Sequence, residues 1–177
     1  CREYKITDQH LNLFWKQFAT SNRFDNSETI YVKRMLQHIL PEHIRVSITE
    51  ELFHEFVGTD TSEFAKNLYL SEENIIEMNF AGMHFGSHGT NHYWLDRLDK
   101  TEQKIDIQVS LNFLNELGCK MQDWVMCYPY GAFNRETIRV LEELGCLIGV
   151  TTQVGVANIT DSNLFTLPRF DTNDFPQ

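Results

Sequence analysis

Two histidines four residues apart, His88 and His92, have the residue type and the spacing that could do chemistry in this chain. On an extended strand, positions four apart lie about 13 Å from each other, which is too far to share an ion. On one turn of helix, or in a tight turn like it, they lie about 6 Å apart at the backbone. Because Zn–N bonds are about 2.0–2.1 Å long, two such rings can bind one metal ion. The alternative interpretation is that both are ordinary surface or capping histidines.

A second cluster, residues 128–134, follows an apolar run further along the chain. Its Pro-Tyr-Gly sequence can form a turn that points a backbone N–H at a reacting oxygen, and such a donor stabilises an oxyanion by about 3–4 kcal/mol. The alternative is a plain turn followed by a helix with its N-cap at Asn134. The histidine pair nearby favours the first interpretation.

The composition of the chain sets limits on its function. Its 177 residues suffice for one domain with a sizeable core, and 42% hydrophobic with 23% charged residues is typical of a globular protein. The formal net charge of −10 would be repelled by phosphate backbones, so we expect no nucleic-acid partner. No apolar run approaches the roughly 18–20 residues of a membrane span. The sequence does not predict an oligomeric state.

Cysteine usage gives no metal or redox motif. Cys1, Cys119, Cys127 and Cys146 form no Cys-x-x-Cys pair and no disulfide framework. Cys127 and Cys146 lie in apolar runs, where we expect them to pack as small hydrophobic side chains. Because the first residue is Cys1 and not Met, we expect the natural start of the protein to lie upstream.

Two unlike segments must position these residues. Residues 1–80 are predicted to be helical: apolar spacing and capping residues indicate helices through 11–18, from 27 to before Pro41, over 42–56, and over 72–80 after Ser71.

Residues 81–177 alternate between strands and helices. Strands are predicted over 83–87, 124–127 and 147–151, with 164–169 as a fourth, and helices over 102–117 and 135–144. This order is typical of a parallel sheet or barrel. In such folds chemistry gathers at the carboxyl ends of the strands. His88, His92 and the 128–134 loop all follow strands, so the sequence predicts one site built from both clusters.

Taken together, these motifs resemble the polysaccharide deacetylase family, whose members carry a NodB-homology domain. The resemblance rests on four segments: 87–92 (SHGTNH), 128–134 (YPYGAFN), 144–152 (LGCLIGVTT) and 167–174 (LPRFDTND). The last of these resembles members encoded among envelope-sugar genes, and the helical first half resembles an insertion found in the same subgroup.

The resemblance implies an α/β fold: an incomplete, distorted (β/α) barrel related to the TIM barrel, with a helical N-terminal segment. Residues 1–80 would be an insertion of this domain and residues 81–177 its C-terminal part. The implied reaction is hydrolysis of the N-acetyl group of an amino sugar in a polysaccharide or envelope-sugar precursor, or occasionally of an O-acetyl group.

The resemblance also implies a divalent metal, usually zinc, bound by two histidines and one aspartate. His88 and His92 match the two histidines. Such an ion polarises the acetyl carbonyl and activates water. Tyr130 matches the tyrosine whose backbone N–H helps to bind the oxyanion. The residues expected to contact substrate around it are Tyr128, Pro129, Gly131, Asn134 and Trp94.

Three departures from the family pattern stand out. The motif Thr-Phe-Asp-Asp-Gly, which supplies the metal-binding aspartate and the general base, is absent, and its usual place would precede Cys1. Cys127 stands where the family has an arginine that pairs with the catalytic aspartate. No histidine follows His92, although the family often uses a late histidine as general acid. We therefore expect these 177 residues by themselves to have negligible activity.

Other acids and other functions are open on the residues alone. Asp96, one turn beyond His92, and Asp171 and Asp174, after the last predicted strand, are alternatives for a third metal ligand. The missing aspartates, Cys127 and the nearby aromatic residues are also compatible with a non-catalytic barrel that binds carbohydrate or a partner. A related hydrolase of a small non-sugar amide is a third hypothesis, because a fold does not fix its substrate.

Overall fold

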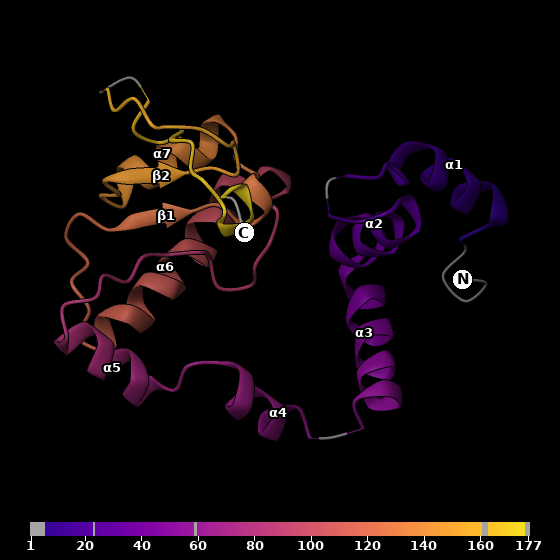
Figure 1. Ribbon diagram of the computed structural model, residues 1–177, viewed down its shortest axis with the longest axis horizontal. Helices are drawn as coiled ribbons and strands as arrows, with labels where there is room; N and C mark the ends of the chain where they lie inside the picture. Colours follow the sequence, from indigo (N-terminus) through magenta and orange to yellow (C-terminus); the bar gives the residue numbers. More distant parts are fainter. Residues whose placement is uncertain (1–5, 23, 59, 161–162, 176–177) are drawn as a thin grey trace. The chain divides into compact units, whose positions relative to one another are not determined.

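A computed structural model of the protein describes residues 6–175, except residues 23, 59, 161 and 162. The chain divides into two compact units, with the boundary between Leu68 and Tyr69 (Figure 1). The helix over 72–80, which the sequence groups with the first segment, belongs to the second unit. Among the helices of the described ranges, none has the length and apolar character needed to cross a lipid bilayer.

The first unit is helical, as the sequence predicts. Thr7 caps its first helix, accepting a hydrogen bond from the backbone N–H of His10 at 3.3 Å. A small core of Met35, Leu40 and Ile44 holds the unit together. Its elements are α1 (Asp8–Phe18), α2 (Ser27–Arg34), a π-helical turn (Met35–Ile39), α3 (Glu42–Phe56) and α4 (Thr61–Leu68).

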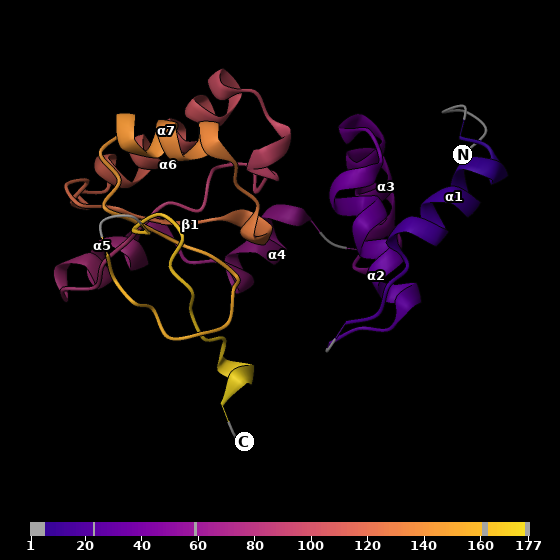
Figure 2. The same cartoon turned by 90° about the horizontal axis from the view of Figure 1, so that it is seen from above.

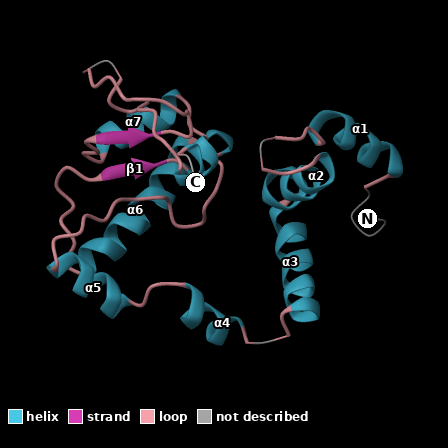
Figure 3. Ribbon diagram, in the orientation of Figure 1, coloured by secondary structure: helices cyan, strands magenta, loops and turns pink. Residues whose placement is uncertain are grey.

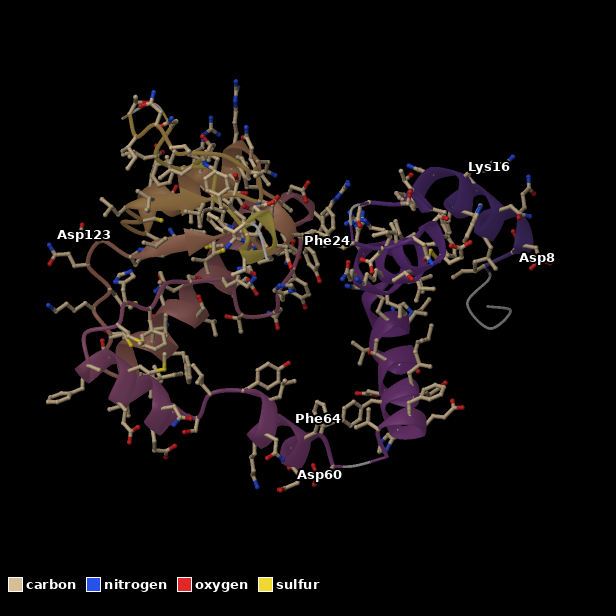
Figure 4. All side chains as sticks on the ribbon, in the orientation of Figure 1. Asp8, Lys16, Phe24, Asp60, Phe64 and Asp123 are labelled. Atoms are coloured by element: carbon tan, nitrogen blue, oxygen red, sulfur yellow. The ribbon has the colours of Figure 1, made fainter. Side chains whose placement is uncertain are left out.

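Helix α4 is absent from the sequence-based prediction. It is short and exposed, and its Phe64 (Figure 4) packs edge-on against Phe53 of α3 with ring centroids 5.5 Å apart. Eight residues give little periodic signal, and a helix this short depends on such contacts for stability.

The second unit contains helices and short strands (Figure 3). Its elements are α5 (Glu72–Phe80), a 3₁₀ turn (Leu95–Arg97), α6 (Lys100–Glu116), β1 (Val125–Cys127), a 3₁₀ turn (Pro129–Gly131), α7 (Arg135–Glu143), β2 (Ile148–Val150) and a 3₁₀ turn (Thr172–Asp174). Helix α6 begins two residues earlier than predicted because Asp99 is its N-cap, accepting from the N–H of Glu102 at 2.8 Å.

Strands β1 and β2 pair in parallel, with Val125 opposite Ile148 and Cys127 opposite Val150. Single bridges extend this ladder on both sides: Ser87 pairs with Met126, and Leu167 pairs with Val150. The strands predicted over 83–87 and 164–169 are thus reduced to one bridge residue each, which corrects the prediction. Pro168, which has no N–H, follows Leu167 and cannot donate to the ladder.

Helices α6 and α7 lie side by side on one face of the strands (Figure 2). Trp124, Met126 and Tyr128 bury their side chains between strand and helices, and the indole of Trp124 donates to the carbonyl of Leu144 at 2.9 Å. Burial of each such side chain contributes about 1.5–3 kcal/mol. The result is an α/β layer, and the described residues do not close into a barrel.

Candidate active site

The parallel ladder brings four chain segments to one edge of the sheet. Ser87, Cys127, Val150 and Leu167 lie at neighbouring positions of this ladder. The residues that follow them therefore emerge together at the carboxyl ends of the strands, where α/β folds place their ligands. The histidine turn follows Ser87, and the Pro-Tyr-Gly turn follows Cys127.

The histidine turn brings the rings of His88 and His92 together, with centroids 4.8 Å apart and planes inclined by 63°. The turn is not helical. Gly89 has φ 72° and His92 has φ 56°, so two residues of five adopt left-handed conformations. The predicted proximity therefore comes from a tight turn and not from a turn of α-helix.

A buried carboxylate that the sequence analysis misses holds this turn. Asp106 of α6 is 4% exposed, and its oxygens accept the backbone N–H groups of Thr90 (3.1 Å) and Asn91 (3.0 Å). Ser87, the residue directly before the turn, also contacts α6: its hydroxyl oxygen lies 2.6 Å from the hydroxyl oxygen of Ser110. The sequence carries one signal for this arrangement. Asp106 is an acidic residue directly beside Ile107, which lies on the buried side of α6.

The Pro-Tyr-Gly turn is a single 3₁₀ turn closed by Gly131 N–H and Ala132 N–H, which donate to the carbonyls of Tyr128 and Pro129. Tyr130 and Gly131 both have positive φ, 58° and 71°. These angles turn the Tyr130 ring toward the histidines, with its centroid 4.6 Å from that of His92.

Trp94 completes a row of rings. Its indole stacks on Tyr130, with centroids 4.9 Å apart and planes within 19°. His88, His92, Tyr130 and Trp94 thus follow one another in contact. The row combines two imidazole rings with two aromatic faces, a combination that suits a metal ion beside an apolar or sugar surface.

Other predicted site residues support the turn from inside. Tyr128 is 1% exposed, stacks on Phe133 and donates its hydroxyl hydrogen to the carbonyl of Phe165 at 2.8 Å. Its burial raises the pKa of the phenol above the ordinary value. Pro129 is also buried, and Asn134 is the N-cap of α7, accepting from Thr137 N–H at 3.0 Å. The substrate contacts predicted for Tyr128, Pro129 and Asn134 therefore gain no support from their positions.

Cys127 is not simply the small hydrophobic side chain that the sequence predicts. Its carbonyl oxygen bonds to Nδ1 of His88, and a hydrogen bond between its thiol and the imidazole raises the pKa of His88 and lowers the pKa of the thiol. Arg169, also missed from the sequence, lies close enough for its positive charge to act on both groups: it helps to lower the pKa of the thiol and partly opposes the rise in the pKa of His88. Burial and the neighbouring His88 lower the pKa of His92.

The hydrogen bond of His88 decides how its ring can act. A carbonyl oxygen only accepts, so Nδ1 must carry the proton and Nε2 keeps its lone pair for a ligand. Metal-binding histidines are commonly oriented in this way. The donor chemistry of this pair therefore fits two positions of a divalent-metal site.

The alternative third ligands have other contacts. The Oδ1 atom of Asp96 is 3.8 Å from Nε of Arg97, and Asp171 and Asp174 form the capping box of the last 3₁₀ turn. Within the described ranges, no group of three or more His, Cys, Asp or Glu side chains could hold a metal ion.

Comparisons with known proteins identify a family. The sequence profile of the family described as "Polysaccharide deacetylase" matches residues 44–148. Over 101 residues the chain is 31% identical to "Putative polysaccharide deacetylase YxkH" of Bacillus subtilis (strain 168), an alignment that covers 57% of this chain and 36% of that protein.

Two solved structures are similar. The Streptococcus pyogenes deacetylase PplD in complex with acetate superimposes with a TM-score of 0.54 and 28% identity, over 60% of this chain and 46% of that one. The BpsB deacetylase domain from Bordetella bronchiseptica has a TM-score of 0.50 and 23% identity, over 57% of this chain and 48% of that one. The second likeness concerns the fold alone. The chain thus spans about a third to a half of the length of these proteins.

Proposed function

The chain belongs to the polysaccharide deacetylase family, and from that premise we propose that the protein hydrolyses the N-acetyl group of an amino sugar in a polysaccharide or envelope-sugar precursor. The observation that carries this proposal is the contact of the His88 and His92 rings beside the Tyr130 turn. The arrangement joins two metal-ligand side chains to a turn that can present a backbone donor.

In this proposal His88 and His92 hold two positions of a divalent metal, most simply zinc, and a carboxylate from outside the described residues completes the set. When bound, the ion polarises the acetyl carbonyl and makes water more acidic. The Cys127 carbonyl keeps His88 in the tautomer whose Nε2 can bind. The backbone N–H of Tyr130 donates to the oxygen that becomes negative in the transition state.

The aromatic faces of Trp94 and Tyr130 would bind the sugar. Pyranose rings present C–H groups on one face, which pack against aromatic rings. Gly131 lets the turn approach Thr152 closely, so its role is to shape the site.

The sheet order fits part of a distorted (β/α) barrel. The ladder runs from Ser87 through β1 and β2 to Leu167, each in parallel, and α6 and α7 follow the first two segments. We propose that further strands complete this barrel in the protein.

Metal content and acetate release test the proposal. Protein expressed from its complete reading frame should hold about one zinc per chain and release acetate from N-acetylglucosamine oligomers. His88→Ala and His92→Ala should each lose the metal and lower kcat/KM at least about a hundredfold, because a bound ion contributes several kcal/mol to the barrier.

His84→Ala is the matched control, since His84 is an exposed histidine four residues before His88. It should leave metal content and rate unchanged. Acetate release that persists undiminished after complete removal of the metal would rule out the proposed mechanism. The 177 residues alone should bind zinc more weakly and show negligible turnover.

One observation favours a second function, carbohydrate binding without hydrolysis. The Trp94–Tyr130 stack is a ready aromatic surface, while the described residues provide only an incomplete ligand set. Under this alternative, oligosaccharides would quench tryptophan fluorescence without acetate release, and Trp94→Ala would weaken binding about 3- to 10-fold.

A further inference from the structure

We propose that Asp106 is a positioning residue that sets the separation of His88 and His92 by binding the two residues between them. The inference rests on the proposed metal site, and deepens it by naming the group that builds it. Asp106 lies in the second turn of α6, 14 residues after His92, and nothing in the histidine motif itself points to it.

Four hydrogen bonds connect Asp106 to the turn. Oδ1 accepts from the backbone N–H of Asn91 at 3.0 Å and from its Nδ2 at 2.8 Å. Oδ2 accepts from the backbone N–H of Thr90 at 3.1 Å. The backbone carbonyl of Asp106 accepts from the hydroxyl of Thr90 at 2.8 Å. Every bond ends on Thr90 or Asn91, so the carboxylate fixes the segment that links the two rings.

The turn needs such an anchor because it is not helical. Backbone N–H groups in a helix are satisfied by carbonyls four residues earlier, and a buried N–H without a partner costs about 1–3 kcal/mol. Here the side chain of Asp106 satisfies the N–H groups of Thr90 and Asn91. The anchor also holds His92 at φ 56°, a conformation that a non-glycine residue adopts only when its surroundings impose it.

The Asp106 carboxylate packs closely against Gly89. A Cβ placed on Gly89 would lie 2.5 Å from Oδ2 of Asp106, so this position requires glycine both for its φ of 72° and for space. The same crowding leaves little room for a longer side chain at position 106.

The chemistry requires an acid and not only a polar group of the same size. The side-chain oxygens of Asp106 face donors only: two backbone N–H groups and the amide nitrogen of Asn91. A carboxylate accepts at both oxygens, whereas an asparagine would turn an NH₂ group against one of these donors. Asp106→Asn therefore changes the anchor while it preserves size and shape.

Zinc titration of the 177-residue chain tests the proposal, with isothermal calorimetry as the readout. Asp106→Asn should weaken zinc binding by at least about tenfold, the effect typical of groups that orient metal ligands. Asp106→Glu keeps the carboxylate but lengthens the side chain, and its zinc affinity should also stay below that of the wild type. Asp99→Ala is the control on the same helix: it removes the N-cap of α6 and lowers thermal stability, but it should leave the zinc affinity unchanged.

Two metal-free measurements separate this inference from the proposed function. In the wild type the amides of Thr90 and Asn91 should exchange slowly, and the ring protons of His88 and His92 should show a nuclear Overhauser effect. Both signals should be lost in Asp106→Asn. If the wild type binds no zinc but shows this pattern, the positioning role holds and the metal proposal fails.

Unchanged ring contacts and zinc affinity in a folded Asp106→Asn variant would overturn the inference. If that variant does not fold, Asn91→Ala decides instead, because it removes one of the four bonds and keeps Asp106. It should weaken zinc binding about threefold, and an affinity equal to that of the wild type would count against the proposal.

Discussion

At the residue scale, one carbonyl oxygen decides how His88 can act. The Cys127 carbonyl fixes the proton on Nδ1, and this bond is a backbone feature that a side-chain substitution at position 127 would leave in place. The arginine expected there from the family pattern is replaced by a thiol in contact with the imidazole, while Arg169, two residues after the Leu167 bridge, brings a positive charge. The site therefore keeps a nearby cation although the motif lacks one.

Replacement of Gly131 is expected to lower the stability of the protein. A Cβ there would lie 2.3 Å from Oγ1 and 3.0 Å from Cγ2 of Thr152, so both branches of this side chain crowd it. The φ of 71° adds about 1–2 kcal/mol of strain for a non-glycine residue. Gly131→Ala should lower the free energy of unfolding by roughly 2–4 kcal/mol in urea titrations.

Two variants control this measurement. Gly82 has φ 88°, but no atom lies within 4 Å of the point that a Cβ would occupy there, so Gly82→Ala should cost only the conformational part, about 1 kcal/mol. Adding Thr152→Ala to Gly131→Ala should recover the part that comes from the clash. Equal losses for Gly82→Ala and Gly131→Ala would show that crowding against Thr152 is unimportant.

At the element scale, α6 is the helix on which the site is built. Its N-cap Asp99 fixes where it begins, Ile107 and Leu111 bury it against the strands, and Asp106 holds the histidine turn. Core packing and site geometry therefore share one element, so that the position of the helix on the sheet also sets the position of the two rings.

An ion-pair group joins α6 to α7 and makes their packing depend on pH. Glu143 of α7 lies 2.5 Å from Nζ of Lys100 and 2.9 Å from Nζ of Lys104. Hydrogen bonds from these lysines lower the pKa of Glu143 to about 2, below its ordinary value of 4.5. Because the pKa is depressed in the folded state, the stabilisation is present above pH 4.5 and is lost as the pH falls toward 2.

Urea unfolding at several pH values checks this pH dependence. Glu143→Gln should be less stable than the wild type at about pH 7, and the difference should shrink between pH 4.5 and 2. The effect should be small and reduced by salt, because the carboxylate is exposed. Glu142→Gln removes the same charge from the exposed neighbouring position and is the control for the change in net charge.

At the scale of the whole molecule, the candidate site belongs to one unit. His88, His92, Asp106 and Tyr130 all lie within residues 69–177, together with the core around Trp124. The family profile nevertheless begins at residue 44, within the first unit. The first unit has a small core of its own, around Met35, Leu40 and Ile44.

Residues 69–177 expressed alone should therefore fold and retain the ring contacts of the site. We expect cooperative thermal unfolding by near-UV circular dichroism, with a zinc affinity within about threefold of that of the 177-residue chain. A non-cooperative transition, or loss of the His88–His92 contact by NMR, would show that the first unit is needed to build the site.

The sequence by itself determined most of the helices, the alternation of the second half and the two motifs. Capping residues such as Thr7, Ser71 and Asn134, and the apolar spacing that follows them, act within a few residues, so α1, α3, α5 and α7 were predicted with nearly their observed bounds. The histidines and the Pro-Tyr-Gly turn were recognisable for the same reason: their chemistry depends on local spacing.

Only the tertiary structure decided what those motifs contact. In the sequence, Asp106 is one of several acids on a predicted helix, and Arg169 is the last residue of a predicted strand. In the structure, Asp106 accepts a hydrogen bond from Asn91, and Arg169 follows the Leu167 bridge and donates to the carbonyl of Thr151, so both contacts join distant parts of the chain. The short bridges at Ser87 and Leu167 likewise depend on neighbours across the sheet. Hydrogen bonds and burial between residues far apart leave no periodic pattern in the sequence, and they set the geometry of this site.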